Sequence, residues 1–446
     1  MLKINNNIST VEVGILSSTK IHFILNSTYT IDNSKYNGEQ EAIIEQGKIL
    51  FNNKLYKEIC LTPINPNGSF TIENVTIGIN FHWERKEKQT FLGKIKLITN
   101  KHEIQFINII DIEEYLKSVI SSEMSSTASL ELLKAHAVIS RSWLLVQIKN
   151  RIFRKKTTDK NFDILSKEPK TNATNEICVW YNSHEHTLFD VCSDDHCQRY
   201  QGITKVLNKN VIEAVEKTKG QILTYDNKIC DTRYSKCCGG VMEEYQYCWE
   251  NIRKPYLVAL PDNKNNISIP DLTNENIATK WITTTEDVFC NTKDEKILKQ
   301  ILNNYDQETQ DFYQWTVTYS QAEISKLINE KLHIDFGYIL DIIPLSRGKS
   351  GRIYRLKIIG SKYNIIIGKE LEIRRVLSKS HLYSSAFIII KNSLSKGIPN
   401  SFTITGKGWG HGVGLCQIGA AVMGEKGYNY KEILYHYYKG AIINSI

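Results

Sequence analysis

The strongest constraint on the fold is a change in hydrophobic periodicity near residue 111. Before it, short apolar segments separated by Asn and Gly predict strands. These strand candidates are residues 10–25 (two strands around a polar turn), 71–78, 93–98 and 103–110. After it, apolar residues recur at helical spacing over residues 111–119 and 129–148, with Asp111 as an N-cap and a Ser-rich loop at 121–126. The chain is therefore predicted to be α+β, with a β-rich N-terminal part and helices lining a substrate cleft.

The remainder of the chain mixes both patterns. Helices are expected at residues 286–304, 321–332 and 371–378, a hairpin at 351–367 that turns at 360–361, and a strand at 387–391. Residues 150–180 are expected to be a loop, and residues 407–440 a Gly-rich loop that runs into a helix. We predict a β-rich region at 1–100 and a larger unit at 101–446, with an inserted α/β subdomain at about 265–400.

Composition excludes several classes of protein. Apolar residues make up 41% of the 446, so the chain can bury a core and is not a disordered protein. No run of eighteen apolar residues occurs, so no transmembrane segment is expected. The net charge of +8 is too dispersed to predict a nucleic-acid partner. The densest basic segment, residues 149–160, is interpreted either as a solvated linker or as a site of attraction to an anionic polymer.

The first residues lack the basic start, apolar core and cleavage site of a signal peptide. Two interpretations follow. Either the protein stays in the cytoplasm, or an export segment is missing from this sequence.

A candidate acid lies just before the long predicted helix, in the sequence Ser121-Ser122-Glu123-Met124. A carboxylate fixed at a cleft can protonate a leaving oxygen, which general acid catalysis requires. The alternative is a capping or surface glutamate. On the helix itself, Lys134 and Arg141 are seven residues apart and share one face. They are candidates for binding a ligand, or members of ion pairs.

Residues 184–197 are dense in His and Cys, which packing alone does not explain. Zinc binds Cys sulfur and His nitrogen in a tetrahedron, and we expect His186, Cys192 and Cys197 to be ligands, with His196 or a water as the fourth. Such a site would be structural, because three or four protein ligands leave little room for a reacting water. The alternatives are a Cys192–Cys197 disulfide or free thiols.

Two further segments carry Gly beside aromatic and polar residues. Tyr234 precedes Cys237-Cys238-Gly-Gly, and five alternating glycines at 406–414 surround Trp409 and His411. Such a run makes neither a good helix nor a good strand, so we expect a loop whose backbone amides face a ligand. An aromatic plate beside an imidazole suits a sugar ring, whereas the alternative for His411 is a hydrogen-bonded structural histidine.

Taken in order, these segments resemble the family of stage II sporulation protein D and the amidase enhancer. The matching segments are Tyr115-Leu116, Ser122-Glu123-Met124, Leu133 to Arg141, Tyr234 to Gly240, Gly408 to Ala420 and Tyr437-Tyr438-Lys439-Gly440. The resemblance covers roughly residues 100–446. Two positions depart from the family pattern: Ser125 replaces a usual Pro, and His136 replaces a usual Gln.

The resemblance implies a peptidoglycan lytic transglycosylase of the cell envelope that prefers glycan strands stripped of their peptides. It gives Glu123 the role of catalytic acid and implies a zinc ion held by a His and cysteines. The candidate substrate-binding residues are Lys134, Arg141, Tyr234, Trp409, His411 and Gln417. A cell-wall amidase is a second partner that the resemblance implies. The alternatives are a non-catalytic glycan-binding or amidase-activating protein, and a zinc-containing cytoplasmic scaffold.

Overall fold

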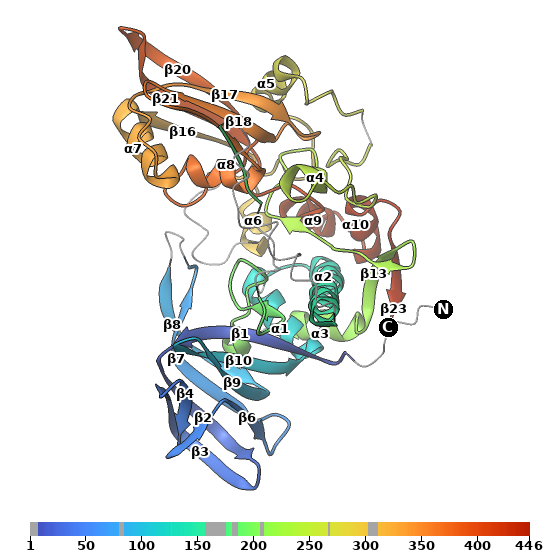
Figure 1. Cartoon of the computed structure of the whole chain (residues 1–446). Helices are drawn as coiled ribbons and strands as arrows, with labels where there is room; N and C mark the ends of the chain where they lie inside the picture. Colours follow the sequence, from blue (N-terminus) through green and yellow to red (C-terminus); the bar gives the residue numbers. More distant parts are fainter. Residues whose placement is uncertain are drawn as a thin grey trace.

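The computed structural model describes residues 8–79, 84–125, 127–156, 175–180, 186–205, 209–265, 268–301 and 311–446. Within these ranges the fold is α+β, with a β-rich N-terminal part, as predicted (Figure 1). The domain boundaries and the substrate cleft stay predictions.

The N-terminal part is one large sheet, whose strands pair in the order β12-β1-β10-β9-β6-β2-β3-β4-β5. Strand β7 also pairs with β2, and β8 pairs with β7. The strands are β1 (Thr10–Ser18), β2 (Lys20–Ile31), β3 (Ser34–Glu45), β4 (Lys48–Phe51), β5 (Lys54–Tyr56), β6 (Glu58–Pro63), β7 (Ser69–Ile77), β8 (Arg85–Leu92), β9 (Lys94–Asn100), β10 (Glu103–Asp111) and β12 (Val191–Cys192). Alternating apolar residues point inward, and the ring of Phe106 lies 5.5 Å from those of both Phe23 and Phe70.

Helices form the layer next to this sheet, in the middle of Figure 1. They are α1 (Ile112–Glu123), α2 (Leu130–Lys156) and α3 (Lys209–Lys217), with a short 3₁₀ turn at Gly202–Lys205. The Asp111 carboxylate caps α1 by accepting hydrogen bonds from the backbone of Glu113 and Glu114, which confirms the predicted cap.

Two boundaries in this layer were predicted wrongly. Helix α1 runs through Ser121 and Ser122 to Glu123, because the Ser122 hydroxyl donates to the Ser118 carbonyl and so satisfies itself within the helix. Helix α2 extends to Lys156, eight residues past the predicted end, and residues 176–178 form strand β11 (Glu176–Cys178) rather than loop. Residues 157–174 lie outside the described residues.

The upper part of Figure 1 holds a second hydrophobic core, built from residues between Trp315 and Ile404. Two sheets, β11-β19-β18-β17 and β16-β21-β20, enclose it with helices α7 and α8. The elements are β16 (Gln314–Ser320), α7 (Gln321–Leu332), β17 (Ile339–Arg347), β18 (Ile353–Gly360), β19 (Asn364–Gly368), α8 (Glu370–Val376), β20 (Phe387–Ser395) and β21 (Ile398–Lys407). The predicted hairpin, the helices at 321–332 and 371–378 and the strand at 387–391 are confirmed, to within a few residues at their ends.

The remaining elements are short, and most of their buried residues belong to the same hydrophobic core as the N-terminal sheet and helices α1 to α3. They are β13 (Gln221–Tyr225), β14 (Lys228–Ile229), β15 (Tyr234–Ser235), α4 (Tyr245–Cys248), α5 (Glu275–Thr283), α6 (Glu295–Ile301), β22 (Leu415–Cys416), α9 (Gln417–Glu425), α10 (Tyr430–Tyr437) and β23 (Ile442–Ser445). The helix predicted at 286–304 begins only at Glu295. Its first part is held in a non-helical turn, because the backbone N–H groups of Phe289 and Cys290 donate to Asp262.

Candidate functional site

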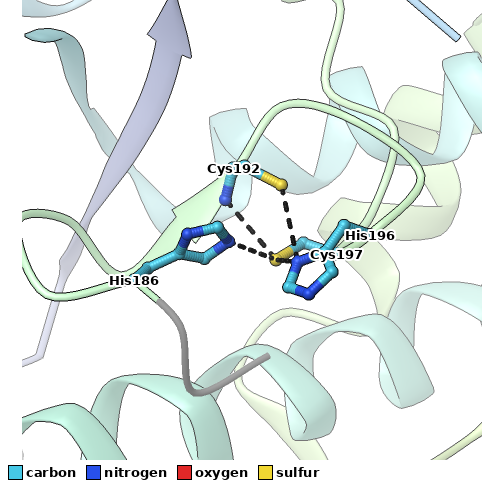
Figure 2. Close-up of side chains that lie close together, drawn as sticks. All are labelled: His186, Cys192, His196 and Cys197. Carbon is cyan, nitrogen blue, oxygen red and sulfur yellow. Dashed lines mark hydrogen bonds between the residues drawn. The ribbon is translucent and has the colours of Figure 1, made fainter. Parts of the chain in front are cut away.

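Figure 2 shows two histidines and two cysteines that converge on one point. The ligand atoms of His186, Cys192, His196 and Cys197 all lie within 4.8 Å of one another. The Cys197 sulfur lies 3.5 Å from His186 Nε2 and 3.6 Å from His196 Nδ1, and the Cys192 sulfur lies 3.9 Å from His196 Nδ1. His184 lies outside the described residues.

This geometry fits a tetrahedral metal ion. Sulfur and nitrogen ligands at ordinary zinc distances are about 3.5–3.6 Å apart in a tetrahedron, close to the observed spacing. All ten cysteines of the chain are described and each is a free thiol, so no Cys192–Cys197 disulfide forms. A hydrogen bond from the Cys197 thiol, with others from the two imidazoles, holds the pKa of Cys192 well below its usual range. The four residues therefore form a cluster that can hold a metal ion.

Buried ion pairs fix the segment that carries this cluster. Arg151 on α2 lies 2.8 Å from Glu12 on β1 and 2.7 Å from Asp190, and it also donates to the Leu188 carbonyl. Strand β12 then pairs in parallel with β1, which places Cys192 beside Gly14. The interpretation of residues 149–160 as a solvated linker is wrong for Arg151, because it is buried in this network. Residues 157–160 lie outside the described residues.

The candidate acid Glu123 lies next to the metal cluster. It is half-buried at the last position of α1, and its Oε1 accepts a hydrogen bond of 3.1 Å from the backbone N–H of Arg199. The Arg199 guanidinium in turn lies 2.5 Å from Asp195. Burial raises the pKa of Asp195 to about 6, with Arg199 opposing the shift and the Glu123 charge adding to it. Arg199, two residues after Cys197, thus contacts both carboxylates, Glu123 through its backbone and Asp195 through its side chain.

Tyr234 lies near Glu123, although it comes from a distant part of the chain. Burial raises its pKa well above the usual tyrosine value, and the charge of Glu123 contributes to that shift. Its ring lies edge-on to His136 of α2, 4.7 Å away. The parallel pairing of β15 with β22 brings Tyr234 beside Leu415 and so next to Gln417. The Gln417 amide lies 3.5 Å from His136 Nε2, and the Ser140 hydroxyl 3.1 Å from Nδ1.

Replacing His136 with Gln should reduce the loss of folding stability at acid pH. Burial, with Lys236 nearby, lowers the pKa of His136 to about 3, so below pH 6.5 the unfolded chain binds a proton that the folded chain does not. Stability therefore falls as the pH drops through this window, by about 2 kcal/mol between pH 7 and pH 5 for this one group. His136→Gln should remove that part of the loss, measured as urea midpoints at both pH values. An unchanged difference between them would contradict the assignment.

Lys134 and Arg141 are both held in ion pairs. The Arg141 guanidinium is fully buried and makes two hydrogen bonds to the Glu113 carboxylate, of 2.9 and 2.6 Å, and one of 2.9 Å to the Gln221 carbonyl. Lys134 pairs with Glu131 at 2.5 Å. Glu113 and Glu123 stand at opposite ends of α1, roughly 15 Å apart at 1.5 Å per residue. The ion-pair interpretation is therefore favoured for both cations, and the Arg141 pair borders a pocket of about 430 Å³ at the start of α1.

Arg141→Met should destabilise the protein far more than Lys134→Met. The first leaves the partly buried Glu113 carboxylate without its two charge-assisted bonds, at a cost of about 2–4 kcal/mol. The second breaks a pair nearer the surface, worth less than about 1 kcal/mol. Urea midpoints of the two variants provide the comparison. Equal small effects would show that the buried pair contributes no more than the other.

The Gly-rich run wraps around a buried arginine. Gly408, Gly410, Gly412 and Gly414 all have positive φ, and a Cβ on Gly412 would lie 2.4 Å from the Arg352 guanidinium. Arg352 donates to the carbonyls of Gly410, Cys238 and Cys237. The backbone N–H groups of Gly408, Trp409 and Gly410 donate to the carbonyls of Tyr313, Cys237 and Tyr383. These amides are therefore already paired within the protein, and their contact with a ligand stays a prediction.

The aromatic residues of the run are likewise packed. The ring of Trp409 lies 4.4 Å from Tyr383 and 4.8 Å from Phe312. His411 Nδ1 accepts the Val413 N–H at 3.0 Å, and burial lowers the pKa of His411 well below its usual value. These contacts favour the structural interpretation of His411, and a sugar-binding role for either residue stays a prediction.

Sequence reasoning missed Arg199 and Arg352 and did not give Asp195 a role. Asp195 lies inside the His- and Cys-rich segment, so that density was the available signal. Nothing in the sequence marks Arg199 or Arg352, because the contacts that tie them to Glu123 and to the Gly-rich run join residues 58 or more positions apart.

The fold and the site together define an α+β protein with a half-buried acid beside a Cys/His cluster. Residues 100–225 match the family model described as stage II sporulation protein, and residues 243–414 match a domain of unknown function. An uncharacterized protein of Brachyspira hyodysenteriae is 27% identical over 354 residues, 79% of this chain and 72% of its own length.

Two named relatives are similarly close. The amidase enhancer of Bacillus subtilis is 26% identical over 74% of this chain, which covers 40% of that protein. Stage II sporulation protein D of Bacillus amyloliquefaciens is 25% identical over 78% of this chain and 77% of its own length. The sequence segments predicted a resemblance to the stage II sporulation protein D and amidase enhancer family, and these matches confirm it. Among the described helices, none combines the length and apolar character needed to cross a membrane.

Proposed function

We propose that the protein is a peptidoglycan lytic transglycosylase that cuts between muramic acid and glucosamine in glycan strands without peptides. The observation that carries this proposal is the position of Glu123, half-buried and oriented by the Arg199 N–H beside the Cys/His cluster. The relationship to stage II sporulation protein D and the amidase enhancer supports a role at the cell wall, and hence a location in the cell envelope.

In the first half of the reaction, protonated Glu123 donates its proton to the glycosidic oxygen. The bond between that oxygen and the muramic acid anomeric carbon breaks, and glucosamine leaves as an alcohol. Positive charge develops on the muramic acid ring, as in other glycoside cleavages. The nearby Glu123 carboxylate stabilises that charge.

In the second half, the Glu123 carboxylate takes the proton from the 6-hydroxyl of the same muramic acid. Its oxygen bonds to the anomeric carbon and closes an anhydro ring. Glu123 ends protonated, ready for the next cleavage, and no water is consumed. One carboxylate thus serves as both acid and base.

Neighbouring residues have supporting roles in this proposal. Tyr234 remains a neutral hydroxyl because of its raised pKa, so it can donate a hydrogen bond to a sugar oxygen near Glu123. Gln417 and His136 hold the strand pair that presents Tyr234. Trp409, His411, Lys134 and Arg141 lie in packed or paired positions, and direct contact with sugar remains a prediction for them.

We propose zinc as the ion of the Cys/His cluster, with His186, Cys192, His196 and Cys197 as ligands. Bound zinc would supply a structural cross-link, because four protein ligands leave no open position for a reacting water. The residues it would fix are Asp195 and Arg199, which lie between and just beyond the ligands and pair with each other. The backbone N–H of Arg199 in turn reaches Glu123.

The rival function is that of an amidase-activating or glycan-binding protein, which is favoured by the name of one relative, the amidase enhancer. Incubation of purified protein with peptide-free glycan strands separates the two. New anhydro ends indicate a transglycosylase. Strands that sediment with the protein but keep their length, or an amidase that works faster in its presence, indicate the rival.

A further inference from the structure

A second cluster of metal-ligating side chains lies away from the first. The ligand atoms of Cys238, Asp262, Cys290 and Cys416 all lie within 4.8 Å of one another, and all four residues are buried. They come from four separate segments: the loop after β15, the stretch before α5, the stretch between α5 and α6, and β22. None of them takes part in the proposed glycan chemistry.

The spacing of the sulfurs fits a shared ion better than a covalent bond. Cys238 Sγ and Cys290 Sγ are 3.5 Å apart. A disulfide would bring two sulfurs to about 2.05 Å. Two thiolates bound to one tetrahedral zinc ion are about 3.8 Å apart.

Hydrogen bonds hold the ligand atoms of the cluster in place. The Cys416 sulfur accepts the Cys238 backbone N–H at 3.2 Å. The Asp262 carboxylate accepts the Cys290 N–H at 2.9 Å and the Tyr437 hydroxyl at 2.8 Å. Hydrogen bonds of this kind, from residues around the ligands, orient the ligands of metal sites.

The buried carboxylate of Asp262 also favours a bound cation. Asp262 is completely buried, and its carboxylate lies 3.6 Å from His436 Nε2, a group that is charged only when protonated. A carboxylate packed against three thiols away from water is costly unless a positive charge offsets it. Thiolate ligands favour a soft ion such as zinc over magnesium or calcium.

We propose that Cys238, Cys290, Cys416 and Asp262 form a second zinc site. Binding releases the three thiol protons, as thiolate coordination requires. The ion joins the loop after β15, the start of α9 with Gln417, the stretch before α5 and the turn before α6. It is therefore a structural clamp between distant segments of one hydrophobic core, to which all three cysteines belong.

Metal counting on the purified full-length chain tests the proposal. Elemental mass spectrometry of protein purified from zinc-supplemented cells should give two zinc ions per chain. Cys290→Ser and Cys416→Ser should each leave one, His186→Ala should leave one, and His186→Ala combined with Cys416→Ser should leave none. The matched control is Cys230→Ser, which removes a buried thiol outside both clusters and should leave two.

One zinc per wild-type chain that survives Cys416→Ser and disappears with His186→Ala would overturn the second site. So would an intact-mass measurement showing a Cys238–Cys290 disulfide in wild-type protein with one zinc. Should the cysteine variants fail to fold, the wild-type stoichiometry still decides. The readout is metal content, so a protein that cleaves no glycan can still support or overturn the clamp.

Discussion

Glu123→Gln is expected to abolish the formation of anhydro ends while leaving the fold intact. The glutamine amide can still accept the Arg199 N–H, so the end of α1 keeps its partner. It cannot donate a proton to the glycosidic oxygen or take one from the 6-hydroxyl. Loss of one group that acts as acid and then as base should lower the rate by at least about 10²–10⁴-fold.

The matched control is Glu114→Gln. Glu114 lies on the same helix and pairs with Lys117 at 2.7 Å near the surface, so the same chemical change there should leave cleavage unaffected. Melting temperatures of both variants close to wild type would show that folding is preserved. Cleavage at the wild-type rate by a purified, folded Glu123→Gln protein would show that another group supplies the proton.

Removal of the metal from the Cys/His cluster is the second large effect we expect. The ligands join the sheet edge at β12 to the turn that contacts Glu123, so a chain without the ion should lose both stability and glycan cleavage. When the free ion is present at a thousand times its Kd, its binding adds about 4 kcal/mol to the free energy of unfolding. Cys197→Ser should therefore lower the melting temperature by several degrees.

Cys60→Ser serves as the control for this experiment, because Cys60 is an exposed thiol on β6 outside the cluster. A chelator should reproduce the loss in wild-type protein, and added zinc should reverse it. Metal-free protein with an unchanged melting temperature and unchanged activity would contradict a structural role for this ion.

The sequence patterns predicted those elements that are stabilised by contacts within their own segment. The helix at Gln321–Leu332 is bounded by a Ser320/Glu323 capping box, and the hairpin of β18 and β19 follows from alternating apolar residues. The end of α1 was missed because serines usually indicate loops, whereas here Ser122 bonds within the helix. Residues 286–294 were missed because their conformation depends on Asp262, more than twenty residues away.

The candidate sites show the same difference between residues close in sequence and residues brought together by the fold. His186, Cys192, His196 and Cys197 are close in sequence, so their density indicated a metal site before any fold was known. The second cluster joins Cys238 to Cys416, 178 positions away, and no spacing rule reaches that far. The Gly-rich run was interpreted as a ligand loop because the sequence does not show that Arg352 fills it.

The most direct test of the proposed function is the chemical form of the new ends that wild-type protein makes on peptide-free strands. Digestion in water enriched in oxygen-18, followed by mass spectrometry, distinguishes ring closure from hydrolysis. The mechanism predicts anhydro ends, one water lighter than hydrolysed ends and without heavy oxygen, since the 6-hydroxyl of the same sugar attacks. Reducing ends that carry oxygen-18, or strands that gain no new ends at all, would contradict it.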